Sequence, residues 1–494
     1  MVIASRLKPG YAHRMSEDQI PPGISAEDWA ATPPAVKALV LSLLETVAVL
    51  QKRLAELEER VNQNSRNSSK PPSSDPPNAP PPPKQTPSGR KAGGQPGHPG
   101  HGRLLQPVES VNHVVPLRPV SCAECGALLL GEDPDPVRRQ VTELPRIEPV
   151  VTEYQQHTVT CLVCGASTPA AWPADLPAGR CGPRLEATIG YVTGRLGLSQ
   201  RDTVELLDTL CHTDLSLGSI PAVEVRVSTA LEKPVAEAVE YVQTQPTNNV
   251  DETSWPLGPR RGWLWTNVTT LVTVFFLLTS RSAEAARQVI GTLTDKIVGT
   301  DRYSAYTWMA VWFRQVCWAH LKRDFQAFVE RGGESQQIGQ ALLAQVEQLF
   351  SLWHRVRDGP LSRTDFQLQV QPLRQRVGEL LRAGAQIAHS KTAATCVKIL
   401  QVEAALWTCV EQAGVEPTNN AAERALRRAV IWRRRSFGTQ SEGGARFVER
   451  ILTVVTTLRQ QHRDVLDYLT EACAAANTKR KAPSLLPNMT KVTA

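Results

Sequence analysis

Apolar residues near the start of the chain recur with the heptad spacing of a coiled coil. The steps between them alternate between four and three residues, with β-branched residues at most a positions and leucine at most d positions. This choice favours a parallel homodimer through a leucine-zipper-like coiled coil over residues 34–62, in which Arg53 of one helix faces Glu58 of the other. An amphipathic helix packed on its own domain is the alternative. The apolar positions are Val36, Val40, Leu43, Val47, Leu50, Leu54, Leu57 and Val61.

A proline-rich segment follows over residues 63–104. Eleven prolines lie between Pro71 and Pro99, with scattered lysines and arginines and almost no large apolar side chain. Such a segment cannot bury enough apolar surface to offset the entropy lost on ordering. We therefore expect a disordered basic linker here.

Residues 105–180 contain two Cys-X-X-Cys-Gly motifs, with strand-like segments near residues 141–144 and 150–160. Each pair can supply two thiolates to one tetrahedral Zn²⁺ ion, and the glycine permits the tight turn of a zinc knuckle. Four thiolates leave no open coordination position, so the ion would be structural. The sequence predicts a zinc-ribbon-like domain with the ligands Cys122, Cys125, Cys161 and Cys164.

The spacing becomes helical over residues 181–245. Two candidate helices, residues 196–210 and 215–231, are separated by a polar turn. This arrangement is compatible with a helix-turn-helix that reads DNA. Plain helical packing explains it equally well, because no base-reading residue stands out.

Residues 246–325 then show the pattern of an α/β fold. Three strands form a meander, a short helix over residues 283–293 leads to a fourth strand, and a helical turn leads to a fifth. This is the order of an RNase H-like core. The predicted strands are residues 249–255, 263–268, 271–279, 296–301 and 311–318.

The strand pattern stops after this first part of the core. Residues 326–414 read as an all-helical insertion, residues 415–472 as the C-terminal helices of the core, and residues 473–494 as a flexible tail. The predicted fold class is therefore α/β, with an RNase H-like catalytic core interrupted by helices.

Three acidic residues occupy suggestive places in this order. Asp251 lies on the first predicted strand and Asp301 at the end of the fourth, and these strands are neighbours in such a core. Glu423 lies about one turn into a helix that Thr418 or Asn419 would cap. By itself, an acid among arginines is typical of a salt-bridged helix face. Together the three can bind Mg²⁺ or Mn²⁺, and a pair of such ions stabilises both the attacking and the leaving oxygen of a phosphoryl transfer.

Other acids compete for these roles. Glu252 points to the opposite face of a regular strand from Asp251, which makes it the weaker ligand candidate. Glu416 and Glu411 are rivals for the third acid, and Glu416 ranks second because its direction before the helix is poorly defined.

The composition is that of an intracellular protein, and its charge permits binding to a polyanion. A chain of 494 residues suggests about three domains, and a net charge of +7 permits nucleic-acid binding. The N-terminus lacks the apolar run of a signal peptide, and the longest apolar stretch, residues 271–278, is too short for a bilayer. We therefore expect a cytoplasmic, nucleoid-associated protein with no membrane contact, whose ten cysteines are reduced, metal-bound or buried.

Basic and amide side chains cluster around the predicted acids. Lys and Arg near a scissile phosphate position DNA without reading its sequence. The expected DNA contacts are His320, Lys322, Arg323, Asn420, Arg424, Arg427, Arg428, Arg433, Arg434 and Arg435.

Several long, irregular motifs resemble those of the insertion-sequence-66 family of bacterial transposases. The resemblance covers nearly the whole chain. Its motifs are NSSKPPSS (residues 67–74), GQPGH (94–98), the two cysteine pairs, VDET (250–253), DRYSAY (301–306), CWAHLKRD (317–324), NNAAER (419–424) and GTQSEGG (438–444).

This resemblance implies an Asp/Asp/Glu (DDE) transposase with Asp251, Asp301 and Glu423 as its metal-binding triad. Such an enzyme binds the inverted repeats of its own mobile element, cuts the DNA ends and joins them to target DNA, and accessory proteins encoded by the same element are expected partners. The alternatives are a catalytically inactive DNA-binding regulator derived from a transposase and a structure-selective RNase H-like nuclease.

Overall fold

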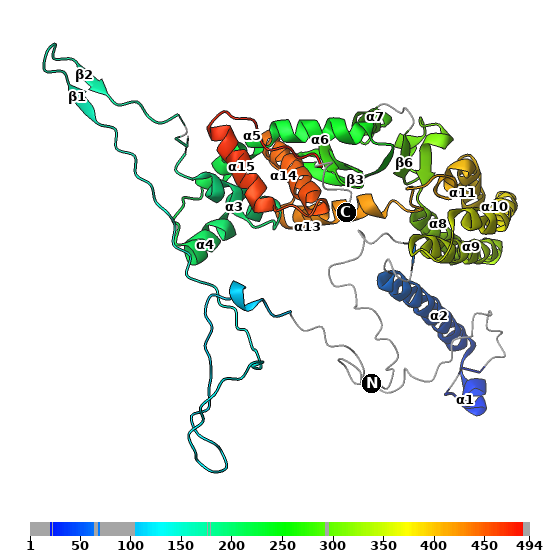
Figure 1. Ribbon diagram of the computed structural model, residues 1–494. Helices are drawn as coiled ribbons and strands as arrows, with labels where there is room; N and C mark the ends of the chain where they lie inside the picture. Colours follow the sequence, from blue (N-terminus) through cyan, green and yellow to red (C-terminus); the bar gives the residue numbers. More distant parts are fainter. Residues whose placement is uncertain are drawn as a thin grey trace.

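The computed structural model of the chain describes residues 20–21, 23–63, 68–69, 104–174, 176–177, 179–291 and 296–487. Within this part the protein is a mixed α/β structure. One five-stranded sheet lies between two groups of helices, the group containing α3, α14 and α15 on one side and the group containing α9, α10 and α11 on the other (Figure 1).

The N-terminal helices carry an exposed apolar stripe. After the short helix α1 (Ala26–Ala31), helix α2 spans Pro34–Asn62, as predicted for this segment. Leu43, Leu50 and Leu54 are more than half exposed, so these residues of the stripe are not buried against the part of the chain that the structure describes. By length and composition alone, the stretch Pro34–Ala55 is also long and apolar enough to cross a membrane. The coiled coil and the absence of membrane contact both stay predictions.

The described part of the segment between α2 and the helical core has little regular structure. Most of the predicted linker lies outside the described residues, so its disorder stays a prediction. Residues 105–180 contain one turn of 3-10 helix, η2 (Val108–Ser110), and a short antiparallel hairpin of β1 (Thr158–Thr160) and β2 (Ser167–Pro169). The hairpin projects away from the sheet (Figure 1). The strand expected at residues 141–144 is not formed.

Four helices form the unit before the sheet. The predicted polar turn is present, but the helices around it begin later than expected. Ser199 caps α4 by accepting the N–H of Asp202, so the preceding stretch from Leu196 stays outside the helix. In α5, Ile220 and Val227 are completely buried. The second helix of the pair is therefore largely a core helix. The four are α3 (Pro183–Gly194), α4 (Gln200–Cys211), α5 (Ser219–Ala230) and α6 (Glu232–Thr244).

The five predicted strands form one sheet in the order β5-β4-β3-β6-β7. The first three are antiparallel, and β6 and β7 run parallel to β3. The fifth strand is shorter than predicted because residues 311–313 form a 3-10 turn. Helix α7 (Ala283–Ile290) connects β5 to β6 and ends at Gly291, whose φ is 75°. The strands are β3 (Thr247–Leu257), β4 (Arg260–Val268), β5 (Thr273–Leu278), β6 (Ile297–Thr300) and β7 (Arg314–Val316).

The insertion is helical, as expected, and has its own core. Phe325, Leu342 and Phe366 are completely buried in it, and Trp318 links it to the end of β7. Its helices are α8 (Trp318–Glu330), α9 (Gly333–Arg357), α10 (Arg363–Gly384), α11 (Ser390–Leu400) and α12 (Thr408–Glu411).

Three helices return the chain to the sheet: α13 (Asn420–Ser436), α14 (Glu442–Gln460) and α15 (Val465–Asn477). Helix α13 packs on β3 and β4. The flexible tail predicted from residue 473 is wrong for the described part, because α15 continues to Asn477 and Leu485 is completely buried. Tyr468 donates its hydroxyl to the carbonyl of Pro483, which holds this segment against the helices.

The edge strand β5 is covered by side chains of α14 instead of by another strand. Backbone N–H groups on alternate residues of β5 donate to side-chain oxygens spaced four residues apart on α14. The spacing matches, because four helical residues rise about 6 Å and two strand residues about 6.6 Å. The pairs are Leu277–Glu449, Phe275–Thr453 and Thr273–Thr457, at 2.5, 3.0 and 3.1 Å.

Removing one acceptor from this ladder should destabilise the fold. Thr453→Val keeps the shape of the side chain but leaves the buried N–H of Phe275 without a partner, at a cost of about 1–3 kcal/mol in the free energy of unfolding. Urea titration checks the value. Thr456→Val, on the same helix at a partly exposed position, should change stability by less than about 0.5 kcal/mol. Equal effects of the two substitutions would contradict the ladder.

Candidate active site

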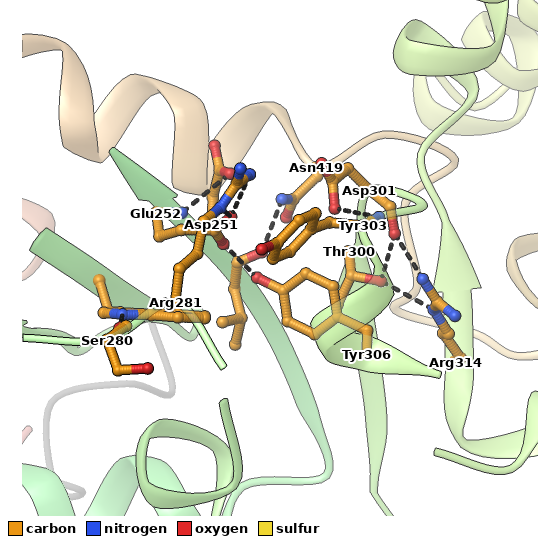
Figure 2. A network of polar contacts seen from close by, with 12 residues as sticks. Asp251, Glu252, Ser280, Arg281, Thr300, Asp301, Tyr303, Tyr306, Arg314 and Asn419 are labelled. Atoms are coloured by element: carbon orange, nitrogen blue, oxygen red, sulfur yellow. Dashed lines mark hydrogen bonds and ion pairs between the residues drawn. The ribbon is translucent and has the colours of Figure 1, made fainter. Parts of the chain in front are cut away.

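Two of the predicted acids occupy matching positions along two neighbouring parallel strands, Asp251 within β3 and Asp301 directly after β6. Asn249 of β3 pairs with Gly299 of β6, so Asp251 and Asp301 each lie two residues beyond the same pair. A Cβ at position 299 would lie 2.5 Å from Asn249 Oδ1, so glycine leaves room for the Asn249 side chain. The pairing of the two strands brings the two carboxylates to one edge of the sheet (Figure 2).

The third acid comes from a different part of the chain and joins them. Glu423 lies in the first turn of α13. Burial raises the pKa of Asp251 well above its ordinary range, and the charges of Glu252, Asp301 and Glu423 raise it further. Burial also raises the pKa of Glu423, against the opposing charge of Arg323. The negative charges of these acids therefore repel one another.

A junction of backbone and side-chain hydrogen bonds holds the acid-bearing elements together. The Asn419 side chain donates to the carbonyl of Val250, the residue before Asp251, at 2.8 Å. The backbone N–H of Asn419 donates to Cys317 Sγ at 3.1 Å. The N–H of Cys317 in turn donates to the carbonyl of Thr300, the residue before Asp301, at 2.9 Å. This Asn419–Cys317 junction ties β3, β6 and the start of α13 to one another.

The junction corrects the expected role of Asn419. This residue does precede the first residue of α13, but its side chain makes no capping hydrogen bond. It reaches across to β3 instead, and Figure 2 shows it between Asp251 and Asp301.

Unpaired oxygens at the site fit a hard metal ion. Within the described residues, Asn419 Oδ1 and Glu423 Oε1 are buried and lack a hydrogen-bond partner. Buried polar atoms normally have a partner, and a bound ion is one kind of partner for such oxygens. Carboxylate and amide oxygens are the donors that Mg²⁺ and Mn²⁺ prefer. The donor set therefore suits such an ion.

The competing acids are engaged elsewhere. Glu252 points to the other face of β3, as strand alternation predicts, where it accepts the hydroxyl of Tyr306 at 2.5 Å and pairs with Arg281 at 2.6 Å. Glu411 pairs with Arg374 at 2.8 Å. Glu416 is exposed and interacts with the charge of Arg357.

His320 and Arg323 lie beside Glu423 instead of on the outer surface. The Glu423 Oε1 atom is 3.5 Å from His320 Nδ1 and 3.7 Å from Arg323. Burial, followed by the charges of Arg323 and Arg302, lowers the pKa of His320 to about 3, so the imidazole is neutral at physiological pH. Lys322, the third basic residue of this motif, is exposed.

The arginines of α13 divide into two groups. Arg433 is engaged with the sheet and donates to Thr253 at 2.9 Å, and neighbouring Trp432 packs edge-on against Trp255 at 6.0 Å. Asn420 is partly buried. The exposed group is Arg424, Arg427, Arg428, Arg434 and Arg435.

Sequence reasoning missed a further arginine beside this exposed face. Arg195 follows α3, and its pKa is lowered by burial and by the charges of Arg428 and Arg459. It shares a small pocket with Arg428 and Arg435. Because Arg195 lies in a separate helical unit, no feature of the sequence indicated that it would lie beside α13.

Each cysteine pair forms the predicted tight turn. Gly126 and Gly165 both have φ of 71°, and each donates its N–H to the carbonyl of the first cysteine of its turn, Cys122 or Cys161. Hydrogen bonds from the backbone N–H groups of Cys125 and Cys164, respectively, lower the pKa of these two thiols. The two turns are not gathered into one cluster of ligand atoms in the described chain.

The Asn419–Cys317 junction should matter for stability. Asn419→Ala removes the donor to the Val250 carbonyl and should lower the free energy of unfolding by about 1–3 kcal/mol, because that buried acceptor loses its partner. Denaturant unfolding measures the change. Asn420→Ala, one residue later and partly exposed, is the control. A loss as large in the control would show that the junction is not the cause.

Comparison with known proteins places this chain in a family. The model described as "Transposase IS66 family" matches residues 179–447, and one described as a family of unknown function (DUF6444) matches residues 27–104. The uncharacterized protein y4hP of Sinorhizobium fredii is 25% identical over 396 residues, covering 72% of this chain and 70% of that protein. The uncharacterized protein y4qI of the same organism is 30% identical over 190 residues, 35% of each chain. The family model spans the helical unit, the sheet, the insertion and the helix with Glu423, and the chain belongs to the IS66 family of transposases.

Proposed function

We propose that this transposase uses an RNase H-like core in which Asp251, Asp301 and Glu423 bind catalytic Mg²⁺ or Mn²⁺. The observation that carries the proposal is the convergence of the three acids: two at matching positions on parallel strands and one on the helix that Asn419 fastens to the first strand. The strand order supports the same core, since three antiparallel strands precede two parallel ones.

The chemistry would be metal-dependent strand cleavage followed by strand transfer. When bound, the ions would help to form the attacking oxygen nucleophile and stabilise the leaving oxygen. The residues of the chain hold the three carboxylates in place, and Arg323 lies beside Glu423 where a phosphate would add negative charge. Because Mg²⁺ prefers oxygen ligands, neighbouring His320 is better suited to contact the phosphate than to hold this ion.

The exposed arginines of α13 would bind the DNA backbone. They lie on the same helix as Glu423 but face solvent, so a phosphate chain can pass over them while its scissile bond reaches the acids. Arg195 would add to this surface from the preceding helical unit. The substrates that we propose are the inverted repeats of the protein's own mobile element and its target DNA.

Substitution of the acids tests the catalytic assignment. Asp251→Asn, Asp301→Asn and Glu423→Gln should each reduce Mg²⁺-dependent cleavage of a DNA carrying the element's ends to background. The amides keep the size of the side chains but remove the charges that bind the ion. Electrophoretic mobility shift should show DNA binding retained. Glu416→Gln is the matched control and should cleave normally.

The outcomes separate the alternatives. Full cleavage by Glu423→Gln would falsify the assignment of that ligand. A wild-type protein that shifts the DNA but never cuts it in any divalent metal ion would be a regulator. One that cuts branched DNA without joining ends would be a nuclease.

We further propose that the two cysteine turns come together on a structural Zn²⁺ ion. The backbone N–H groups that lower the thiol pKa of Cys122 and Cys161 also stabilise the thiolates that zinc requires.

A parallel coiled-coil homodimer is the third part of the proposal. Leu50 lies on the predicted stripe and Val49 does not, although both are more than half exposed. Leu50→Lys should convert a dimer to a monomer in analytical ultracentrifugation, because a buried lysine at a d position is costly. Val49→Lys should leave the dimer intact.

The same pair distinguishes the membrane alternative. A helix that spans a bilayer faces lipid on all sides, so both lysine substitutions would weaken binding to phospholipid vesicles. Vesicle binding that is lost equally in both variants, with a monomer throughout, would contradict the coiled coil.

A further inference from the structure

Three potential metal ligands of different chemistry meet beside the proposed magnesium site. Cys317 and His320 lie at the start of α8, and Glu423 lies on α13. One ligand atom from each, a sulfur, a ring nitrogen and a carboxylate oxygen, lies within 4.8 Å of the other two. No other such group occurs in the part of the chain that the structure describes.

Two of these atoms lie close together without a hydrogen bond. Within the described residues, His320 Nδ1 and Glu423 Oε1 are buried, lie 3.5 Å apart and have no hydrogen-bond partner, and Arg323 lies 3.7 Å from the same Glu423 oxygen. In a tetrahedral zinc site with metal–ligand bonds of about 2.0–2.1 Å, nitrogen and oxygen ligands lie about 3.3 Å apart. The observed separation is therefore close to that of two ligands on one ion.

The third atom receives backbone hydrogen bonds that offset part of the effect of its burial. Cys317 is the N-cap of α8, and its sulfur accepts the N–H of Asn419 at 3.1 Å. Backbone N–H groups at a helix start favour negative charge. A positive ion would add to this effect and allow the thiol to lose its proton in an otherwise buried place.

We propose that Cys317, His320 and Glu423 form a binding site for one thiophilic divalent cation such as Zn²⁺. On binding, the thiol of Cys317 releases its proton to solvent, and sulfur, nitrogen and oxygen each donate to the ion, with water as a fourth ligand. Mg²⁺ is excluded by the sulfur and nitrogen donors, which suit softer ions. The site thus differs in specificity from the oxygen site formed with Asp251 and Asp301.

Because Glu423 belongs to both sites, the two ions would compete for it. This consequence rests on the proposed function, whereas the binding of zinc does not. Zn²⁺ held by Cys317 and His320 would turn the Glu423 carboxylate away from the aspartates. Zinc would then inhibit cleavage, and the inhibition would be relieved by more Mg²⁺.

Co²⁺ is the probe for the site itself, because a cobalt–thiolate bond gives a charge-transfer absorption. The full-length protein with Cys122→Ser and Cys161→Ser, which disables the exposed cysteine turns, should still show this absorption. Adding Cys317→Ser should abolish it. Adding Cys396→Ser instead should not, although this cysteine is also buried and burial raises the pKa of both thiols to about 11. Equal absorption with and without Cys317 would overturn the proposal.

A second variant covers the case in which Cys317→Ser does not fold, which circular dichroism would reveal. Glu423→Gln keeps the thiol and should weaken Co²⁺ binding by more than about tenfold, since even outer-shell changes cost 10–100-fold in metal affinity. An unchanged Co²⁺ affinity would also overturn the site.

Zn²⁺ inhibition of Mg²⁺-dependent cleavage is then measured at increasing Mg²⁺. Inhibition that Mg²⁺ does not relieve would contradict the sharing of Glu423. If the protein cleaves no DNA at all, the proposed function fails, and the cobalt result still decides the zinc site.

Discussion

The hydrogen bonds around Asn419 and Cys317 are the contacts on which the arrangement of the acids depends. The three carboxylates come from β3, the end of β6 and α13, and the helical insertion separates the last from the other two. Asn419 and Cys317 connect these elements within one residue of Asp251 and Asp301 and four residues of Glu423. The connection is made mainly through backbone atoms, so small shifts of the strands or of α13 would move the acids together.

The rest of the sheet keeps this junction rigid. One face packs against α13 and α14 and the other against α7. The ladder from α14 to β5 closes the edge that would otherwise expose unpaired N–H groups, a recognised hazard of edge strands. The insertion forms a separate core anchored by Trp318, whose ring nitrogen donates to the carbonyl of Leu406 at 2.7 Å. A large segment can thus enter between Asp301 and Glu423 without disturbing the sheet.

The positions of the strands along the chain, the helical character of the insertion and the long N-terminal helix follow from periodicity, which is a local property of the chain. The direction of the Asn419 side chain does not, because capping and reaching across to β3 are equally compatible with NNAAER. Contacts between distant segments escaped prediction for the same reason: Arg195 beside α13, the α14 side chains on β5 and Leu485 in the core all depend on tertiary packing. Among the acids, alternation along β3 was enough to separate Glu252 from Asp251, since that distinction needs only a regular strand.

Charge is distributed over α13 in a way that opposes stability and favours function. Glu423 lies in the first turn, where the helix dipole favours an anion. The nearest basic side chains belong to α8: Arg323 is 3.7 Å and the neutral His320 is 3.5 Å from the Glu423 carboxylate. An acid that is partly buried near two others without close ion pairs raises the free energy of the metal-free fold. The same arrangement keeps the carboxylate beside the other two acids and the exposed arginines of α13 facing solvent, and the packing of α13 on the sheet has to supply the energy that this separation costs.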